Sequence, residues 1–193
     1  MDLVAFRRAH PGIDIRLNIG NTAQVAAAVR DGAAELGFVE GVIDDPVLTV
    51  EQIARDQLIV VVGPEHPWSM IDHLKPGRLI ESDWVLREPG SGTRSVFEAA
   101  LERFGLFPAA LRVALELPSN EAVRSAVEAG MGATAISASV ASPSLEAGLL
   151  HHVTLTLPER DFLVLRHAGR YRTRAGSALL EIISAWSGQT RTR

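Results

Sequence analysis

The sequence predicts an α/β protein built from two small lobes. Three observations support this fold class. Strand-like and helix-like segments alternate along most of the chain, turns rich in glycine and small polar residues separate them, and the second half repeats the order of the first. Strands that alternate with helices favour mostly parallel sheets, which bind ligands above the carboxyl ends of their strands.

The first half starts with an alternating segment and ends with a strongly apolar one. Apolar and polar residues alternate over Ile13–Ile19, which predicts a strand, and Leu58–Val62 holds five consecutive apolar residues, four of them β-branched. The other elements expected here are an Ala-rich helix from Asn21–Thr22 to Asp31–Gly32, a strand over Leu36–Val39, and a short helix over Ser69–Leu74.

The second half repeats the same order of elements. The expected elements are a strand over Trp84–Leu86, a helix to about Phe104, a strand over Val113–Leu117, a helix after Pro118–Asn120, a strand over Ala133–Ser137, an alternating segment over His151–Leu157, a strand over Phe162–Leu165 and a last helix with Leu179, Ile183 and Trp186 on one face.

Composition restricts the classes of function. The 193 residues are 47% hydrophobic and 22% charged, with a net charge of −4 and no cysteine. An acidic chain of this kind is not expected to bind nucleic acid itself. The lack of cysteine excludes disulfides, thiolate nucleophiles and cysteine-based zinc sites within the sequence. Met1–His10 resembles neither a signal peptide nor a membrane span, so we expect a cytoplasmic protein without membrane contact.

The segment Glu88–Arg94 is the strongest candidate binding site. It lies between a predicted strand and a helix, so Ser91, Gly92 and Thr93 would place backbone N–H groups and two hydroxyls at a helix N-terminus. Such a site suits an anion, although a helix start that is only capped explains the same residues.

Alternatives remain for the next residues along this helix. Arg94 could neutralise an anion, or it could pair on the surface with Glu98 four residues later. Ser95 with Glu98 could form a capping box, which would start the helix later.

Further candidates lie where other predicted strands end. Asn21 and Thr22 in the first half, and Ser119 and Asn120 in the second, each begin a helix, which capping alone also explains. Glu40 ends a strand and could bind a cationic or hydroxyl group of a ligand, or only solvate a loop.

No arrangement of residues predicts an enzyme, a metal site or a cofactor. The stretch from Gly130 to Ala135 fits a G-x-G-x-x-A pattern, but a helix precedes it and a strand follows, which is the reverse of a dinucleotide-binding motif. Ser91 lacks a G-x-S-x-G context, and His151 and His152 are adjacent and would point to opposite faces of a strand. The glycines more simply form a helix C-terminal turn.

Several motifs together resemble the effector-binding domain of LysR-type transcriptional regulators. The matching segments are Phe6–Gly12, the run from Asp31 to Phe38, the first crossover segment Asp56–Pro67, the ligand loop Glu88–Arg94, and Gly130–Gly132 followed by a β-rich stretch. The resemblance extends to about Trp186, and the order and spacing of these motifs carry it.

The resemblance implies a two-lobe fold like that of type II periplasmic binding proteins. Lobe I would comprise residues 1–62 and 161–193, lobe II residues 63–160, and two crossover strands would form the hinge. A small anion or carboxylate would bind in the cleft, with Asn21, Thr22, Glu40, Ser91, Gly92, Thr93, Arg94, Ser119 and Asn120 as candidate contacts. The family further implies homodimers or tetramers formed through lobe helices.

Two departures from the family pattern lead us to expect a fragment. The winged helix-turn-helix and linker helix of the family have no counterpart here, and its domain begins with a strand that precedes the helix around Phe6. We expect a small-molecule sensing domain that controls DNA binding through hinge and dimer rearrangement. The alternative is a stand-alone solute-binding module of the same fold.

Overall fold

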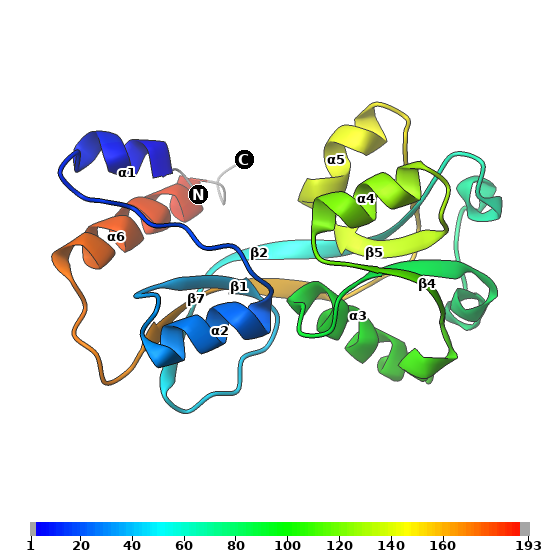
Figure 1. Ribbon diagram of the computed structural model, residues 1–193. Helices are drawn as coiled ribbons and strands as arrows, with labels where there is room; N and C mark the ends of the chain where they lie inside the picture. The colour runs from blue at the N-terminus through cyan, green and yellow to red at the C-terminus, as the bar shows by residue number, and fades with distance from the viewer. Residues whose placement is uncertain (1–2, 190–193) are drawn as a thin grey trace. The chain divides into compact units, whose positions relative to one another are not determined.

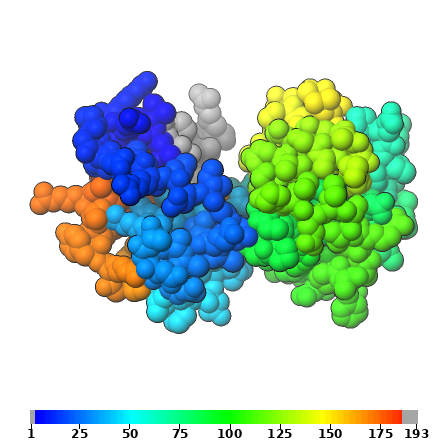
Figure 2. Space-filling view, viewed as in Figure 1, coloured from blue at the N-terminus to red at the C-terminus, as the bar shows by residue number. Residues whose placement is uncertain are grey.

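The computed structural model describes residues 3–189, with side chains as far as residue 185. These residues divide into two compact units: unit 1 lies within Met1–Val39, Ile43–Ala54 and Asp161–Arg193, and unit 2 within Glu40–Val42 and Arg55–Arg160. Blue and orange segments, which are far apart in the sequence, share the surface of unit 1, whereas green and yellow segments cover unit 2 (Figure 2).

Unit 1 is a small sheet with three helices. Its strands β1 (Gly37–Glu40), β7 (Glu159–His167) and the first part of β2 (Leu48–Val62) are neighbours in that order, and its helices are α1 (Leu3–Ala9), α2 (Thr22–Asp31) and α6 (Arg174–Gln189) (Figure 1). Helix α1 packs against α6. Apolar side chains of α2 and all three strands form the core, namely Val29, Val39, Leu48, Leu163 and Leu165.

Unit 2 contains the larger sheet. The last part of β2 pairs with β6 (His151–Val153) and with β5 (Ala133–Ser137), and the sheet continues through β3 (Asp83–Arg87) to β4 (Arg112–Leu117). The helices are α3 (Gly92–Arg103), α4 (Asn120–Glu128) and α5 (Ala138–Glu146), and three 3-10 turns span Pro67–Met70, Pro76–Glu81 and Pro108–Ala110. Strand β3 runs parallel to β4 and β5, while β2 runs antiparallel to β5 and β6.

The apolar run at the end of β2 supplies core to both faces of this sheet. Leu58, Val60 and Val62 belong to the cluster that includes Trp84 and Phe97, whereas Ile59 and Val61 belong to the cluster under α4 and α5. Successive side chains of a strand point to opposite faces, so five consecutive apolar residues are needed where helices cover both sides.

The α/β fold class is confirmed, and most predicted elements are present. The strand predicted over Ile13–Ile19 is wrong: these residues form no ladder, and none of residues 14–20 makes a backbone hydrogen bond to another described residue. Leu17 is 61% and Ile19 93% exposed. An alternating pattern becomes a strand only where a neighbouring backbone can share its hydrogen bonds, and no described segment does so here.

Three smaller predictions also differ from the structure. The helix expected over Ser69–Leu74 is instead a single 3-10 turn that starts at Pro67, because a proline with its fixed φ begins the turn earlier and His66 caps it. The alternating segment after His151 forms a strand only to Val153. Helix α5 was not expected, since it contains Pro143 and follows a strand directly.

The last predicted helix is present as α6. Ile183 is buried and Leu179 half-buried, as its pattern predicted, whereas the side chain of Trp186 lies outside the described part of the chain. None of the helices between residues 3 and 189 combines the length and apolar character that a bilayer span requires.

Candidate functional site

Two helix N-termini lie side by side at one edge of the sheet in unit 2. Strands β3 and β4 are parallel neighbours whose last residues, Arg87 and Leu117, are register partners. Each strand leads into a helix, α3 after Arg87 and α4 after Leu117. The carboxyl ends of parallel strands meet at one edge, so the unpaired N–H groups and positive dipole ends of both helices meet there as well.

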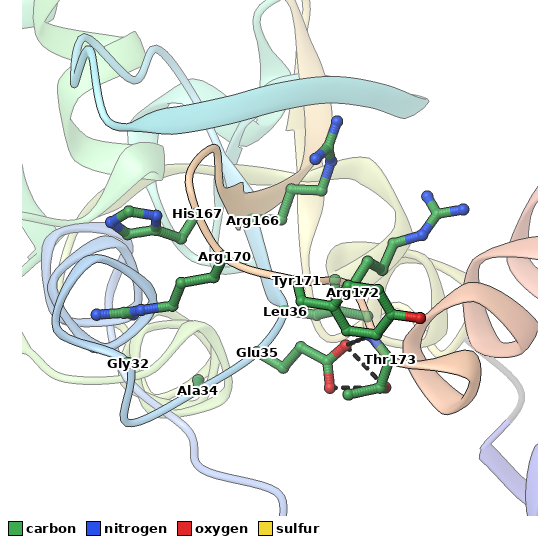
Figure 3. Close-up of a pocket in the computed structure, with 10 residues that line it drawn as sticks. All are labelled: Gly32, Ala34, Glu35, Leu36, Arg166, His167, Arg170, Tyr171, Arg172 and Thr173. Atoms are coloured by element: carbon green, nitrogen blue, oxygen red, sulfur yellow. Dashed lines mark hydrogen bonds between the residues drawn. The ribbon is translucent and has the colours of Figure 1, made fainter.

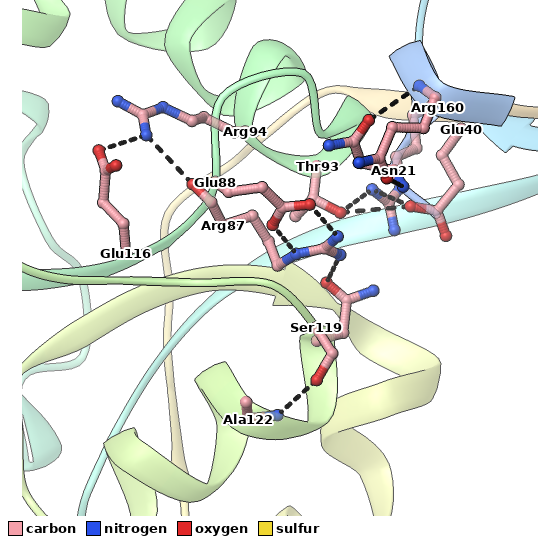
Figure 4. Close-up of polar contacts among 12 residues, drawn as sticks. Asn21, Glu40, Arg87, Glu88, Thr93, Arg94, Glu116, Ser119, Ala122 and Arg160 are labelled. Carbon is pink, nitrogen blue, oxygen red and sulfur yellow. Dashed lines mark hydrogen bonds and ion pairs between the residues drawn. The ribbon is translucent and has the colours of Figure 1, made fainter. Parts of the chain in front are cut away.

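Arg87 connects these two helix starts. Its Nη1 donates to Oδ1 of Asn120 at 2.9 Å, while Nε and Nη2 donate to the carboxylate of Glu88 at 2.9 and 3.1 Å (Figure 4). Ser119 is the N-cap of α4, and its Oγ accepts from the N–H of Ala122 at 3.1 Å. Ser119 and Asn120 are therefore used within the protein, one as a cap and the other as a link to β3.

Ser91 is the N-cap residue of α3, but its hydroxyl does not cap the helix. The residue is only 3% exposed, and its side chain accepts no hydrogen bond from the first turn. Within the described part of the chain, its Oγ has no hydrogen-bond partner at all. Nε of Arg124, and not this oxygen, is the fully buried side-chain atom that lacks a hydrogen-bond partner among the described residues. The Ser91 Oγ is therefore accessible, and its hydroxyl can bond to a water or a ligand.

Thr93, in contrast, is held in a buried ionic network. Its Oγ1 accepts from Nη1 of Arg160 at 2.8 Å and donates to Oε2 of Glu40 at 3.2 Å (Figure 4). The side chain of Arg160 is 1% exposed and pairs with Glu40 at 2.7 Å and with Asp56 at 2.6 Å. The hydroxyl of Thr93 and the carboxylate of Glu40 thus position one another.

A close approach of two glycines allows this network to form. Gly41 has φ +94°, and a Cβ there would lie 3.2 Å from the Cα of Gly92. Only glycine adopts this backbone conformation readily, and a side chain would push the end of β1 away from α3. The two glycines therefore bring Glu40 within reach of Thr93.

Arg94 faces the acidic residues of its own unit. Its Nε donates to Glu98 at 2.7 Å, and Nη1 donates to Glu116 and to the carbonyl of Arg87. Burial alone would lower the pKa of Arg94, but its hydrogen bonds and charge pairs with Glu98 and Glu116 outweigh burial and raise the pKa. Since α3 already begins at Gly92, the alternative capping box of Ser95 with Glu98 is wrong, and Ser95 Oγ donates to the carbonyl of Gly92 instead.

The remaining candidates, Asn21 and Thr22, lie in unit 1. Asn21 is the N-cap of α2, where its Oδ1 accepts from the N–H of Gln24 and the Gln24 side chain accepts from the N–H of Asn21, both at 3.0 Å. This reciprocal capping box gives Asn21 a structural role at the helix start.

The glycine pair after α4 forms a helix C-terminal turn, as expected. Gly130 has φ +84° at the end of α4, and its N–H donates to the carbonyl of Val127. Gly132 has φ +120°, and a Cβ there would lie 2.3 Å from the carbonyl oxygen of Asp83 in β3. The G-x-G spacing serves the packing of β5 on β3 and not a dinucleotide.

Sequence reasoning missed Arg87, Asp56 and Arg160. Arg160 appears only in an ordinary Pro-Glu-Arg-Asp turn, and its partners lie 104 and 120 residues earlier in the chain. The described residues hold no group of three His, Cys, Asp or Glu side chains arranged to bind a metal ion.

Comparison with known proteins identifies the family. Residues 3–187 match the family model described as the LysR substrate binding domain. The chain belongs to this family of LysR substrate-binding domains. The match covers nearly all of the described residues, including both units.

Two curated relatives match most of this chain, and one of them is named as a transcriptional regulator. The chain is 40% identical over 188 residues to a protein of Anaeromyxobacter dehalogenans named phosphonates import ATP-binding protein PhnC. This alignment covers 94% of this chain and 36% of that protein. It is 32% identical over 156 residues to the uncharacterized HTH-type transcriptional regulator YeiE of Escherichia coli K12, covering 81% of this chain and 52% of that protein. The chain thus spans about half or less of the length of these curated relatives.

Solved structures of this LysR domain family share the fold. The regulatory domain of CcmR from Synechocystis PCC6803, in complex with 2-PG, superposes with a TM-score of 0.84 at 24% identity, covering 96% of this chain and 88% of that one. The effector-binding domain of QuiR in complex with shikimate gives a TM-score of 0.82 at 14% identity, covering 97% of this chain and 88% of that one.

Proposed function

We propose that this chain is the small-molecule sensing domain of a LysR-type regulator, and that unit 2 binds the anionic group of its effector at the starts of α3 and α4. The observation that carries the proposal is the Ser91 hydroxyl, which has no partner among the described residues although Ser91 as a whole is only 3% exposed. It lies at the N-terminus of a helix of 12 residues, where N–H groups of the first turn also lack intrahelical acceptors.

The distribution of charge favours an anion at Ser91 and a structural role for Thr93. Arg160 lies between the carboxylates of Glu40 and Asp56, so its positive charge is already compensated within the network. An effector carboxylate would accept from Ser91 Oγ and from backbone N–H groups at the start of α3, with the dipoles of α3 and α4 adding to the attraction. Thr93 Oγ1, held by Arg160, would keep the first turn of α3 in place.

The same network offers a route from the site to the connections between the units. Strand β2 passes from unit 1 into unit 2 after Ala54, and β7 passes back after Arg160. Asp56 and Arg160 lie within two residues of these crossings and are bonded to each other and, through Arg160, to Thr93. An effector that binds the start of α3 would thereby favour one arrangement of the two connecting strands through its differential affinity.

The rest of the proposal concerns the whole regulator. The domain would form homodimers or tetramers through its helices, so that a change at the connecting strands alters the spacing of attached DNA-binding modules. We infer a binding role and not a catalytic one. Supporting this, the Ser91 hydroxyl is bonded to no histidine or carboxylate within residues 3–189 that could act as a general base.

Calorimetric titration of the full chain tests this proposal. Shikimate, 2-PG and a simple alkylphosphonate are suitable first probes, followed by a panel of small carboxylates. For the compound that binds, Ser91→Ala should weaken affinity about tenfold, the cost of losing a hydrogen bond to a charged group. Because Ser91 does not cap α3, the midpoint of urea unfolding should stay unchanged.

Ser125→Ala is the matched control. Ser125 is exposed on α4, away from the start of that helix, so its loss should alter neither affinity nor stability. An effector whose affinity is the same for wild type and Ser91→Ala would contradict the proposed site.

A stand-alone solute-binding module is the alternative function. The reason to test it is the relative named as a phosphonates import ATP-binding protein, of which 36% matches 94% of this chain. In that case a phosphonate would bind, and the natural full-length protein would show no effector-dependent DNA binding. Gel-shift assays of that protein with and without the bound compound separate the two functions.

A further inference from the structure

Unit 1 contains a cavity that the proposed function does not use. Its volume is about 240 Å³, and it lies where the C-terminal end of α2 meets the loop between β7 and α6. All of its lining residues belong to unit 1, so it is separate from the Ser91 site of unit 2. The residues around it are Gly32, Ala34, Glu35, Leu36, Arg166, His167, Arg170, Tyr171, Arg172 and Thr173 (Figure 3).

The wall of this cavity carries an excess of positive charge. Arg166, Arg170 and Arg172 contribute three positive charges and Glu35 one negative charge, a net of +2 with His167 neutral, in a chain whose total charge is −4. In Figure 3, Arg166 and Arg172 extend to one side of the cavity and Arg170 and His167 to the other. A locally positive surface of this kind attracts small anions even though the chain as a whole is acidic.

The single carboxylate on the wall is held by hydrogen bonds from its own neighbours. Glu35 accepts from the N–H of Thr173 at 2.9 Å and from its Oγ1 at 2.9 and 3.0 Å. Gly176 in the first turn of α6 lets this carboxylate approach, since a Cβ there would lie 2.4 Å from Glu35 Oε1. Glu35 thus stabilises the start of α6, where a negative charge is favourable, and its hydrogen bonds go to Thr173 and not to the arginines.

Arg170 has a structural role of a similar kind. Its Nη1 donates to the carbonyl of Val29 at 3.0 Å, at the C-terminal end of α2, and its guanidinium lies against Gly32. A cation at a helix C-terminus satisfies free carbonyls and complements the dipole. Arg170 therefore forms one wall of the cavity, and its hydrogen bond to α2 gives it a structural role, so we look to other side chains for ligand contacts.

The donors that remain are free to bind a ligand. The side chain of Arg166 is half-buried and makes no hydrogen bond or ion pair to any residue in the described part of the chain. Arg172 uses only Nε, which donates to Ser177 Oγ at 2.8 Å. His167 Nδ1 accepts from the N–H of Gly169 at 3.0 Å, so in the neutral ring the proton lies on Nε2, a further donor.

We propose that this cavity is a second anion site, which binds a phosphate group, free or carried by a small molecule. Arg166 and Arg172 are its principal ligands, because guanidinium groups bind phosphate through two parallel hydrogen bonds. Tyr171, which is 86% exposed, supplies an aromatic face for the body of a phosphate monoester. This site does not depend on the proposed function of unit 2.

Titration of the full chain with inorganic phosphate and with glycerol 3-phosphate, followed by amide NMR, tests the proposal. We expect saturable shifts at residues 32–36 and 166–173, and tighter binding of the monoester if the site serves a phosphorylated molecule. The double variant Arg166→Gln, Arg172→Gln should weaken binding by about tenfold or more, since two charge-assisted contacts are lost. The exposed Arg103→Gln on α3 is the control and should bind as wild type does.

Two results would overturn this second site. One is phosphate binding that shifts only the amides of Ser91–Arg94 and is lost in Ser91→Ala, which would assign the anion to unit 2. The other is shifts that rise linearly with phosphate in both wild type and the double variant, which would mean general ionic-strength effects. Wild-type unfolding midpoints in the double variant would exclude misfolding as the cause of a loss. We expect them, because the two substitutions remove only the bond from Arg172 Nε to Ser177 Oγ, and the side chain of Arg166 has no partner among the described residues.

Discussion

The buried guanidinium of Arg160 forms an ion pair with Glu40 at 2.7 Å, and both groups bond to the hydroxyl of Thr93. Arg160 is the second residue of β7 and the last residue of unit 2, and Glu40 ends β1. One arginine therefore holds together the end of β1, the strand β2 through Asp56, and the first turn of α3. Arg160 thus positions the residues around the candidate site, although we assign it no contact with a ligand.

Removal of Arg160 should strongly destabilise the protein. In Arg160→Met, the partly buried carboxylates of Glu40 and Asp56, which are 22% and 15% exposed, would lose their common cation. Breaking a buried pair from one side costs about 3–5 kcal/mol. Urea unfolding measures this loss, and the triple variant with Glu40→Gln and Asp56→Asn should recover part of it. A loss below about 1 kcal/mol, the value of a surface pair, would contradict the network.

His66 should make stability depend on pH. Its Nδ1 accepts from the N–H of Trp68 at 3.0 Å, so the neutral ring carries its proton on Nε2, 2.9 Å from Ser82 Oγ. Burial lowers the pKa of His66 below its ordinary 6.5, and Asp83 raises it only in part. As pH decreases through about 6.5, His66 becomes protonated in the unfolded chain while it is still neutral in the folded chain. The free energy of unfolding therefore falls as pH decreases.

Urea unfolding at about pH 7.5 and about pH 5.5 measures this effect. The loss of stability between these values should shrink in His66→Gln and remain in His73→Gln, since His73 is exposed. An equal loss in wild type and His66→Gln would contradict the assignment.

Gly132 should tolerate no side chain. Its φ is +120°, and a Cβ would lie 2.3 Å from the backbone oxygen of Asp83, so Gly132→Ala must displace β3 from β5. We expect a loss of about 2 kcal/mol or more in unfolding free energy. Gly77→Ala is the control, because nothing lies within 4 Å of its Cβ position, and it should change stability by less than about 0.5 kcal/mol. Similar losses in both variants would disprove the close packing at Gly132.

The extended segment before α2 should be insensitive to polar substitution. Ile19 is 93% exposed, so Ile19→Ser should change the unfolding free energy by less than about 0.5 kcal/mol. Val60→Ala, in the fully buried part of β2, should cost at least about 1 kcal/mol and serves as the contrast. A cost for Ile19→Ser as large as that for Val60→Ala would show that residues 13–19 are packed in solution.

Most elements of the fold were predicted from local sequence patterns. The clearest failure, the strand predicted over Ile13–Ile19, has a physical cause. The run Leu58–Val62 and the strand before Glu88 were predicted because burial on both faces leaves a continuous apolar signature. The alternation over Ile13–Ile19 is equally clear in the sequence, yet strand formation also needs a neighbouring backbone. An alternating pattern shows that a segment can form a strand, but it does not show whether a neighbouring strand is present to pair with it.

The candidate site followed from sequence only where its residues are neighbours in the chain. Ser91 and the start of α3 were predicted because a strand, a small turn and a helix occur in direct succession. The pair of Arg94 with Glu98, one of its two predicted alternatives, is present, whereas the second partner, Glu116, could not be predicted because it comes from β4. Asp56 and Arg160 carry no local signal, because their meaning arises from a pairing across 104 residues.

Amide NMR of the full chain, titrated with a panel of small carboxylates, phosphonates and phosphate esters, tests the central claim most directly. The account predicts that an effector produces saturable shifts at Ser91–Arg94 and at Ser119–Asn120, where the two helices of unit 2 begin. The same compound should bind about tenfold more weakly to Ser91→Ala. Saturable binding that leaves these amides unshifted, or a panel in which nothing binds saturably, would contradict an anion-binding site at the start of α3.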